Sequence, residues 1–452
     1  MLETRPNDSP DVDLPTWDDP RQVATCSQNV EFNRRVFLHR LSAISCAMTR
    51  LACPSNAHGA TRVDASSRVS GMLMGSLVGD ALGGPVEFLD RDKSRAVLPN
   101  ARDWDRDRML DATTLQELAD SLHMLSYETL RPDTAAYGPW SRQAKAGTVT
   151  DDSRHKMIVM RALQKMISDE RQRITDKDLA KQFLAFQPHR DRIPEAELAR
   201  LVEEGLREYR YAARWVLGER ENALPVERLW AGVSNCSGQM ALLPLAGLFP
   251  GDPLTAYRET YAIDFLDAPI ARDICSAINA ALAAALDEAL NEASPQERWK
   301  ALLTGLRTDP FRYADVPFAG RQLDRWLDLS DSIVERAAGQ PASIYRLLEQ
   351  EGRPVYYWDA HFTLLVPLTM LKACRFDPLA AMHLTLDFGH DSDSYAQVLG
   401  AMVGAVHGIN VFPDAMVNAV ADRLNADFGE SVDQWESTLS TASSLWVSNT
   451  DR

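Results

Sequence analysis

Seven glycines recur at four-residue spacing in two apolar segments that lie far apart in the chain. They are Gly71, Gly75, Gly79 and Gly83 in the first segment and Gly400, Gly404 and Gly408 in the second. This spacing places the glycines of each segment on one face of a helix, where the missing side chains let a second backbone approach closely. Because a glycine inside a helix costs about 1 kcal/mol relative to alanine, two such rows need a packing or functional reason. We therefore expect two helices buried in the core.

A membrane dimerisation face is the alternative interpretation of such glycine rows. Asp80 interrupts the first segment, and neither segment reaches the roughly 20 apolar residues that a bilayer crossing needs. Helix packing within a globular protein is therefore favoured, and no membrane partner is expected. Apolar residues also recur with helical spacing elsewhere, as in 271–293 and 341–351, and strand signals are rare.

Two short acidic clusters carry carboxylates next to hydroxyls. One is Thr150-Asp151-Asp152-Ser153, and the other lies in Gly389-His390-Asp391-Ser392-Asp393-Ser394. Oxygen donors of this kind suit Mg²⁺, Mn²⁺ or Ca²⁺. Either cluster alone is more often a solvated cap or turn, so the interpretation as a metal site depends on the two clusters occurring together with the glycine rows.

The composition of the chain agrees with a globular enzyme and argues against a protein that binds nucleic acid or membranes through its overall charge. The 452 residues, 45% hydrophobic and 25% charged, are enough for one large domain with extensions. The net charge of −16 argues against a protein that grips nucleic acid or an anionic membrane through its overall field. Clustered aspartates repel one another, which favours dependence on a cation.

Four blocks of sequence, taken together in their order, resemble the ADP-ribosylglycohydrolase family. That family includes the dinitrogenase reductase-activating glycohydrolases and the ADP-ribosylarginine and ADP-ribosylserine hydrolases. The blocks are GMLMGSLVGDALGGPVEF from Gly71, GTVTDDS from Gly147, GVSNCSGQMALLPLAGLFP from Gly232 and FGHDSDSYAQVLGAMVGAVHG from Phe388. Any one block is a weak signal, since such short patterns occur by chance in many proteins.

The resemblance implies an all-α fold, a compact orthogonal helical bundle with a two-metal centre at the mouth of a cleft for ADP-ribose. It implies two divalent cations, Mg²⁺ in first place and Mn²⁺ in second. The metal ligands that it implies are Thr150, Asp151, Asp152, Asp391, Asp393 and Ser394. Ser394 stands where the family usually has threonine, and it offers the same oxygen.

Asp151, Asp152 and Glu87 are the catalytic residues that we expect. Cleavage at a ribose C1″ passes through an oxocarbenium-like state, which needs negative charge beside the ring and an activated water. One carboxylate, for example Asp152, would act as base, and the sequence leaves open which one. Glu87 matches a family glutamate that controls substrate access, so it is a gate or a proton carrier. The alternative for Glu87 is a solvated residue at a helix end.

The third block departs from the family pattern. Gly232, Ser237 and Gly238 keep the small side chains that let backbone N–H groups approach a pyrophosphate, so we expect them to bind substrate. Ala241 stands where the family commonly has arginine. Further on, Asp264 and Asp267 occur where arginine- and serine-specific relatives often have a histidine. These aspartates would either recognise a cationic leaving group or cap the helix that follows.

Three parts are expected along the chain. We expect residues 1–66 to form an N-terminal extension, 67–413 the ADP-ribosylglycohydrolase domain with an insertion beside the cleft at 89–145, and 414–452 a C-terminal helix and polar tail. Asn33-Arg34-Arg35 resembles the start of a twin-arginine export leader. The extension is equally compatible with a basic cytoplasmic helix, so localisation stays open between an exported, periplasmic protein and a cytoplasmic one.

The leading hypothesis for function is a metal-dependent hydrolase that removes ADP-ribose from a protein side chain or a small acceptor. The expected partner is an ADP-ribosylated protein or a small ADP-ribosyl compound, and the enzyme is expected to be a monomer that binds no nucleic acid. One alternative is a non-catalytic ADP-ribose-binding or immunity protein that counters an ADP-ribosyltransferase toxin. The other is a divalent-metal hydrolase of a different nucleotide-sugar bond.

Overall fold

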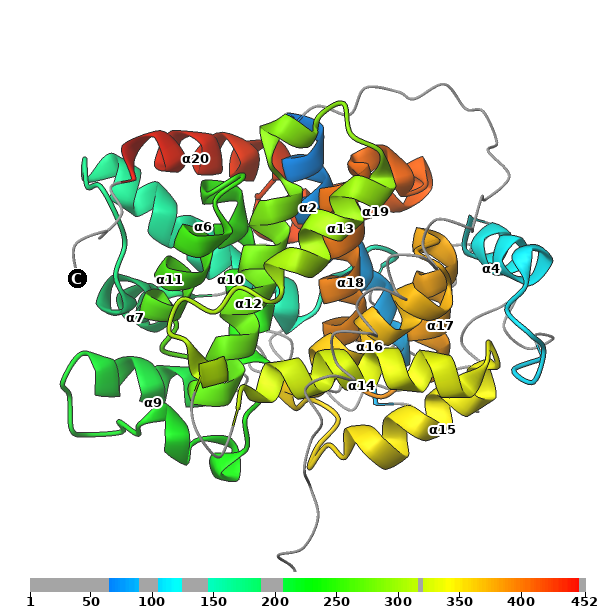
Figure 1. Cartoon of the computed structure of the whole chain (residues 1–452). Coiled ribbons are helices and arrows are strands. Elements are labelled where there is room, and N and C mark those ends of the chain that lie inside the picture. Colours follow the sequence, from blue (N-terminus) through cyan, green and yellow to red (C-terminus); the bar gives the residue numbers. More distant parts are fainter. Residues whose placement is uncertain (1–64, 89–104, 124–144, 188–205, 316–319, 447–452) are drawn as a thin grey trace, which may run out of the picture. The chain divides into compact units, whose positions relative to one another are not determined.

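The described part of the chain is built from helices. The computed structural model describes residues 65–88, 105–123, 145–187, 206–315 and 320–446, and these contain sixteen α-helices and no strand (Figure 1). One isolated backbone bridge, between Asn235 and Asp359, joins two loops. The prediction of an all-α fold is confirmed.

The α-helices follow one another with short connections in most of the described chain. Their bounds are α2 Ala65–Gly83, α4 Ala112–His123, α6 Asp151–Ser168, α7 Asp176–Ala185, α9 Arg207–Val216, α10 Ser237–Leu242, α11 Pro253–Ile263, α12 Pro269–Ala285, α13 Pro295–Gly305, α14 Gln322–Ala337, α15 Pro341–Gly352, α16 Ala360–Ala373, α17 Pro378–Phe388, α18 Ser392–His407, α19 Asp414–Phe428 and α20 Val432–Leu445. Short 3₁₀ segments connect several of them, at η2 Gly84–Val86, η5 Val226–Arg228, η6 Trp230–Gly232, η7 Leu243–Leu248, η8 Glu288–Leu290, η9 Tyr313–Asp315 and η10 Ile409–Val411.

The two glycine rows lie against each other at the centre of the fold, in α2 and α18 (Figure 1). A Cβ atom at Gly71 would overlap the backbone of Gly404, and one at Gly75 would overlap Gly400. The rows run antiparallel, because each step of four residues forward in α2 meets a step of four residues back in α18. The expected burial of both helices is confirmed, since every residue of α18 from Ser392 to Val406 is buried.

The antiparallel contact also decides where the ends of the two helices lie. A Cβ atom at Gly83, the last residue of α2, would overlap the backbone of Asp393 in the first turn of α18. Ser392 Oγ donates a hydrogen bond to the carbonyl of Gly83 at 2.9 Å. The glycine packing therefore brings the acidic start of α18 against the end of α2 and the loop that carries Glu87.

The remaining helices surround this pair. α12, α16 and α17 are buried over most of their length, and α6 packs between α10 and α20. The helical periodicity seen at 271–293 and 341–351 corresponds to α12 and α15. These contacts produce one continuous core of aliphatic and aromatic side chains through the described residues.

The C-terminal stretch differs from the expected single helix with a polar tail. It contains two helices, α19 and α20, and α20 packs on α6 and α2. Trp435 is fully buried, and its Nε1 donates to Glu430 Oε2 at 3.0 Å. The apolar residues of α20 lie three and four positions apart among serines and threonines, so the composition hides the helical face that the core covers.

Two of the expected segments fall wholly or partly outside the described residues. The possible export leader lies in 1–64, and of the 89–145 stretch the structure describes 105–123 and Lys145, with α4 packed on α17. In the described part of the chain, no helix combines the length and apolar character that a membrane crossing requires. The proposed boundaries of the three parts stay predictions.

Candidate metal centre

The first acidic cluster forms the start of α6 and is held by a carboxylate from α2. Thr150 is the N-cap of α6, and its Oγ1 accepts from Asp152 N at 3.3 Å. The buried Asp80 accepts from Thr150 N at 3.1 Å and Thr150 Oγ1 at 2.6 Å, and also from the amide and hydroxyl of Ser153. Asp80 therefore sets the orientation of the whole cluster. The sequence analysis did not predict this role, although a single aspartate in an apolar glycine row is a signal for it.

The second acidic cluster forms the turn into α18. Gly389 and His390 both have positive φ, 75° and 61°, which turns the chain sharply after α17. Asp391 then precedes the first residue of α18, and Asp393 and Ser394 lie in its first turn. Ser394 N donates to Asp393 Oδ1 at 2.9 Å. The carboxylates thus lie at the positive end of a helix dipole, as do those of α6.

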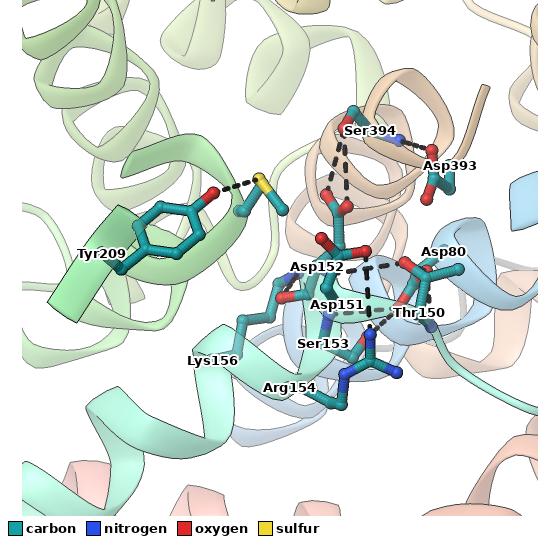
Figure 2. A network of polar contacts seen from close by, with 11 residues as sticks. Asp80, Thr150, Asp151, Asp152, Ser153, Arg154, Lys156, Tyr209, Asp393 and Ser394 are labelled. Atoms are coloured by element: carbon teal, nitrogen blue, oxygen red, sulfur yellow. Dashed lines mark hydrogen bonds and ion pairs between the residues drawn. The ribbon is translucent and has the colours of Figure 1, made fainter. Parts of the chain in front are cut away.

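The two clusters meet, although roughly 240 residues separate them in the chain. Ligand atoms of Asp151, Asp152 and Asp393 lie within 4.8 Å of one another, and so do those of Glu87, Asp391 and Asp393. Figure 2 shows Asp151 and Asp152 from α6 beside Asp393 and Ser394 from α18. Ser394 Oγ lies 3.4 and 3.5 Å from the two carboxylate oxygens of Asp152. Five of the six expected ligands therefore lie in or beside these groups, and the sixth, Thr150, directs its hydroxyl to Asp80 Oδ1.

Burial and mutual repulsion work against ionisation of these carboxyl groups. Burial, with neighbouring aspartates as the next cause, raises the pKa of Glu87, Asp152 and Asp393 well above the ordinary values. Burial raises the pKa of Asp391 to about 7. A site in which five carboxylates crowd together is stable as an anion only when positive charge compensates it.

Two basic side chains of α6 supply part of that charge. Lys156 is buried, and its Nζ donates to the carbonyl of Asp152 at 3.2 Å (Figure 2). Arg154 Nη2 lies 3.9 Å from Asp151 Oδ1. Neither residue was predicted from the sequence, because basic residues in a helix more often lie on a solvated face.

The residues present fit divalent cations. Two basic side chains offset only part of the charge of Glu87 and the four aspartates. The carboxylate and hydroxyl oxygens that face one another are the donors that Mg²⁺ and Mn²⁺ prefer. The side chain of Asp151 is 39% exposed, so the cluster is accessible from solvent.

The expected phosphate cradle lies near this centre, but its amide hydrogens already have acceptors. Gly232 N donates to Leu229 O at 2.7 Å, and Ser237 N to Asn235 Oδ1 at 3.3 Å. Gly238 N donates to Asp267 Oδ1 at 2.8 Å. A phosphate would have to compete with these acceptors, and substrate binding by Gly232, Ser237 and Gly238 stays a prediction.

Asp264 and Asp267 form a second acidic group, which is sealed inside the protein. Their exposed fractions are 1% and 0%. The alternative that they cap the following helix is wrong, because the N-cap of α12 is Ala268 and no side chain caps it. Asp264 Oδ1 instead accepts from the amides of Leu266 and Asp267, at 3.0 and 3.2 Å. A cationic leaving group does not reach side chains this deeply buried.

Comparison with known proteins places the chain in one family. No curated protein matches the chain. The family described as ADP-ribosylglycohydrolase matches residues 61–446, which is most of the chain and includes both acidic clusters and both glycine rows. With its all-α fold, the chain belongs to the ADP-ribosylglycohydrolase family.

Proposed function

We propose that the protein is a divalent-metal-dependent hydrolase that cleaves the glycosidic bond between ADP-ribose and a modified protein side chain or a small acceptor. The family acts on ADP-ribose linkages and generally depends on divalent metals. The observation that carries the proposal is the convergence of carboxylates from α6 and α18 within 4.8 Å. Thr150, Asp151, Asp152, Asp391, Asp393 and Ser394 are the ligands that we propose, for two cations.

Asp152 is the proposed general base. It is buried beside Ser394, in the group formed with Asp151 and Asp393. A water molecule that attacks C1″ gives one proton to this carboxylate as the new C–O bond forms and the bond to the acceptor breaks. Bound cations would supply the positive charge that orients the ribose hydroxyls and lowers the pKa of the attacking water.

Glu87 is the proposed proton carrier for the departing acceptor. Its ligand atoms lie with those of Asp391 and Asp393, and its side chain is partly exposed, unlike those aspartates. Burial, with neighbouring aspartates as the next cause, raises the pKa of Glu87 well above its ordinary value, which is the direction that suits a proton donor. The pKa of Asp152 would be lowered by the cations that it binds, which suits a base. A position between the carboxylate cluster and solvent also suits a gate for the substrate.

The experiment that tests the proposal measures release of free ADP-ribose from arginine-, serine- and glutamate-modified proteins. Each reaction is run with Mg²⁺ or Mn²⁺ and again after treatment with EDTA. Metal-dependent release from one class of substrate is the expected result, and it would identify the linkage. The Asp391→Ala protein serves as the control for a contaminating hydrolase. Absence of release from all three classes contradicts the proposal.

A second candidate function is hydrolysis of another nucleotide-sugar bond by the same centre. The amides of Ser237 and Gly238 are bonded within the chain, and Ala241 replaces the usual arginine, which leaves the pyrophosphate without an evident cradle. A panel of free nucleotide sugars beside the modified proteins distinguishes the two functions. Cleavage of small nucleotides alone favours the second.

A further inference from the structure

A sulfur atom lies among the oxygen donors of the metal centre. Cys236 Sγ is 3.9 Å from Asp391 Oδ2 and 3.6 Å from Ser394 Oγ. The cysteine is 3% exposed, so the fold encloses the thiol on the side of the centre next to α10. Neither of the two acidic sequence motifs contains this residue, which occurs about 155 positions before Asp391.

Main-chain hydrogen bonds fix the backbone before and after Cys236. Asn235 pairs with Asp359 in the isolated bridge, and Ala360 N donates to Ser234 O at 2.9 Å. After the cysteine, Met240 N donates to Cys236 O at 3.0 Å as α10 begins. The position of Sγ beside Asp391 is therefore determined by main-chain contacts.

The thiol contacts the same side chains that form the carboxylate centre. Ser394 Oγ contacts Cys236 Sγ and both carboxylate oxygens of Asp152, while Asp391 Oδ2 contacts the same Sγ. One sulfur, one hydroxyl and two carboxylates from three segments of the chain therefore face a common region. A set of this mixed kind suits zinc-class cations better than a set of oxygens alone, because thiolate favours Zn²⁺ and its neighbours in softness.

We propose that Cys236 is an additional ligand of the metal centre, through which the centre takes thiophilic divalent cations such as Zn²⁺, Cd²⁺ and Co²⁺. The inference rests on the proposed function, because it requires the same carboxylate centre to bind cations. As such a cation binds, the metal–Sγ bond forms, the S–H bond breaks and the proton passes to solvent. Mg²⁺, a hard cation, binds through the oxygens without Cys236.

If Cys236 is a ligand, the centre should prefer thiophilic cations, and replacing this one residue should remove the preference. Cys236→Ser keeps a side chain of similar size that can hydrogen-bond to Asp391 and Ser394, but it replaces the soft donor by a hard one. The variant is expected to bind Cd²⁺ at least about 10-fold more weakly than the unchanged protein. Its affinity for Mg²⁺ is expected to change less than about 3-fold, since that cation does not use the sulfur.

The test uses Co²⁺ with the full chain and reads the thiolate-to-cobalt charge-transfer absorption in the near ultraviolet. The unchanged protein should show this band, and Cys236→Ser should lack it. Cys374→Ser is the matched control, because this thiol is buried at the C-cap of α16, and the variant should keep the band. Cys275 lies with Asp264 and Asp267 in a separate group whose ligand atoms come within 4.8 Å of one another, so Cys275→Ser measures any contribution of that group, and it too should keep the band. A triple variant that replaces the remaining cysteines by serine should keep it as well; these are Cys26, Cys46 and Cys53.

Thermal unfolding with Mg²⁺, Mn²⁺ and Co²⁺ separates failure of this inference from failure of the proposed centre. A Co²⁺-induced rise in melting temperature without a charge-transfer band in the unchanged protein overturns the role of Cys236 and leaves the centre in place. A band that persists in Cys236→Ser overturns it too. Absence of any rise with all three cations removes the metal centre itself, and the inference with it.

Discussion

The protein contains two groups of buried carboxyl side chains. Both bring negative charges close together, but the charge is offset in a different way in each group. The metal centre joins Glu87 with four aspartates from α6 and α18, and it is accessible from solvent through Asp151, 39% exposed. The second group is the pair Asp264 and Asp267, with 1% and 0% exposure. Both groups contain more carboxylates than the basic side chains beside them neutralise.

The difference lies in how the oxygens are arranged and what can reach them. In the proposed metal centre, carboxylates and hydroxyls from separate helices face one another beside two helix N-termini, which is the arrangement that a hydrated cation would need to enter and complete the site. In the sealed pair, Oδ2 of Asp264 and Oδ2 of Asp267 have no other hydrogen-bond partner and both approach Gly238. A proton shared by the two carboxyls would compensate the charge there, because burial raises the pKa of both.

The comparison teaches that burial alone does not identify a metal site. Burial raises the pKa of Asp152 and of Asp267 well above the ordinary value, so a shifted pKa is common to both groups. The sealed pair also lies within 4.8 Å of a third possible ligand, Cys275 of α12, so the convergence of donors does not separate the two groups. Access from solvent is what distinguishes the centre. The predictions below separate the two groups, beginning with the largest effect.

Removal of a centre carboxylate should abolish hydrolysis, whereas neutralisation of the pair should not. Asp391→Ala and Asp151→Ala are each expected to lower the rate of ADP-ribose release by more than about 100-fold, because a ligand of the cations is lost. Asp267→Asn should keep the rate within about 3-fold. Circular dichroism of each variant checks that the helices are intact. Full activity in both alanine variants would contradict the two-metal centre.

Divalent cations should stabilise the protein through the centre only. At a Mg²⁺ concentration about 100 times the dissociation constant, the free energy of unfolding should rise by about 2.7 kcal/mol for each cation bound. Asp393→Asn should remove most of this increase, and Asp267→Asn should leave it unchanged. The measurement is the midpoint of urea unfolding with Mg²⁺ and with EDTA. If Mg²⁺ raised the free energy of unfolding equally in the two variants, the assignment of the cation to the first group alone would be wrong.

Each group of carboxylates packs against a glycine, Gly83 for the metal centre and Gly238 for the sealed pair. Substitution of either glycine by alanine should lower the stability of the protein, by more at Gly83. A Cβ atom at Gly83 would overlap the backbone of Asp393, which cannot yield, while one at Gly238 would meet the carboxylate oxygens of Asp267 and Asp264. Both substitutions should destabilise by about 1 to 3 kcal/mol, with Gly83→Ala at the upper end.

Metal binding tells the two alanine variants apart. Gly83→Ala should also lower the affinity for Mg²⁺, because the start of α18 moves, and Gly238→Ala should not. Isothermal titration with Mg²⁺ is the measurement. A greater loss of Mg²⁺ affinity in Gly238→Ala would contradict the assignment of the two groups.

The sealed pair should make stability fall as pH rises. Burial raises the pKa of Asp267 in the folded protein, so above pH 4 the folded state retains a proton that the unfolded state has lost. The contribution of this group to the free energy of unfolding is fully present at pH values below the pKa of the unfolded state. As the pH rises from there to the pKa of the folded state, the contribution decreases by up to about 1.4 kcal/mol per pH unit.

Asp267→Asn should flatten that pH dependence, because the amide keeps an oxygen for Gly238 N and donates to Asp264 in place of the shared proton. Melting temperatures from pH 5 to 9 measure the slope, with Asp328→Asn, whose side chain is 73% exposed, as the control. An unchanged slope in Asp267→Asn would mean that the pair does not share a proton.

The contrast between the two groups also shows how far the sequence could predict the site. The hydroxyl and carboxylate motifs at Asp151 and Asp391 were recognisable because each places its donors within one helical turn. Asp80 and Cys236 belong to no such motif, and they join the centre only through packing. Their roles were not predicted for that reason.

Asp264 and Asp267 show the opposite error. They precede a helix, which made a cap a reasonable expectation, yet Ala268 occupies the N-cap position and Asp267 bonds to Gly238, 29 residues earlier. A local rule identifies residues that can cap a helix, but it does not determine whether a more distant amide takes the same carboxylate. The fold resolves that competition.

By itself the sequence determined the helical class, the two glycine faces and the identity of the oxygen donors, because these depend on side-chain type and on spacing within a single helix. The tertiary structure decided which donors meet, which carboxyls are sealed from solvent and which basic side chains of α6 are buried. The physical reason is the antiparallel contact of α2 and α18, whose backbones touch where side chains are absent. That contact, together with the hydrogen bonds from Asp80 to the start of α6, brings residues roughly 240 positions apart to within the reach of a metal ion.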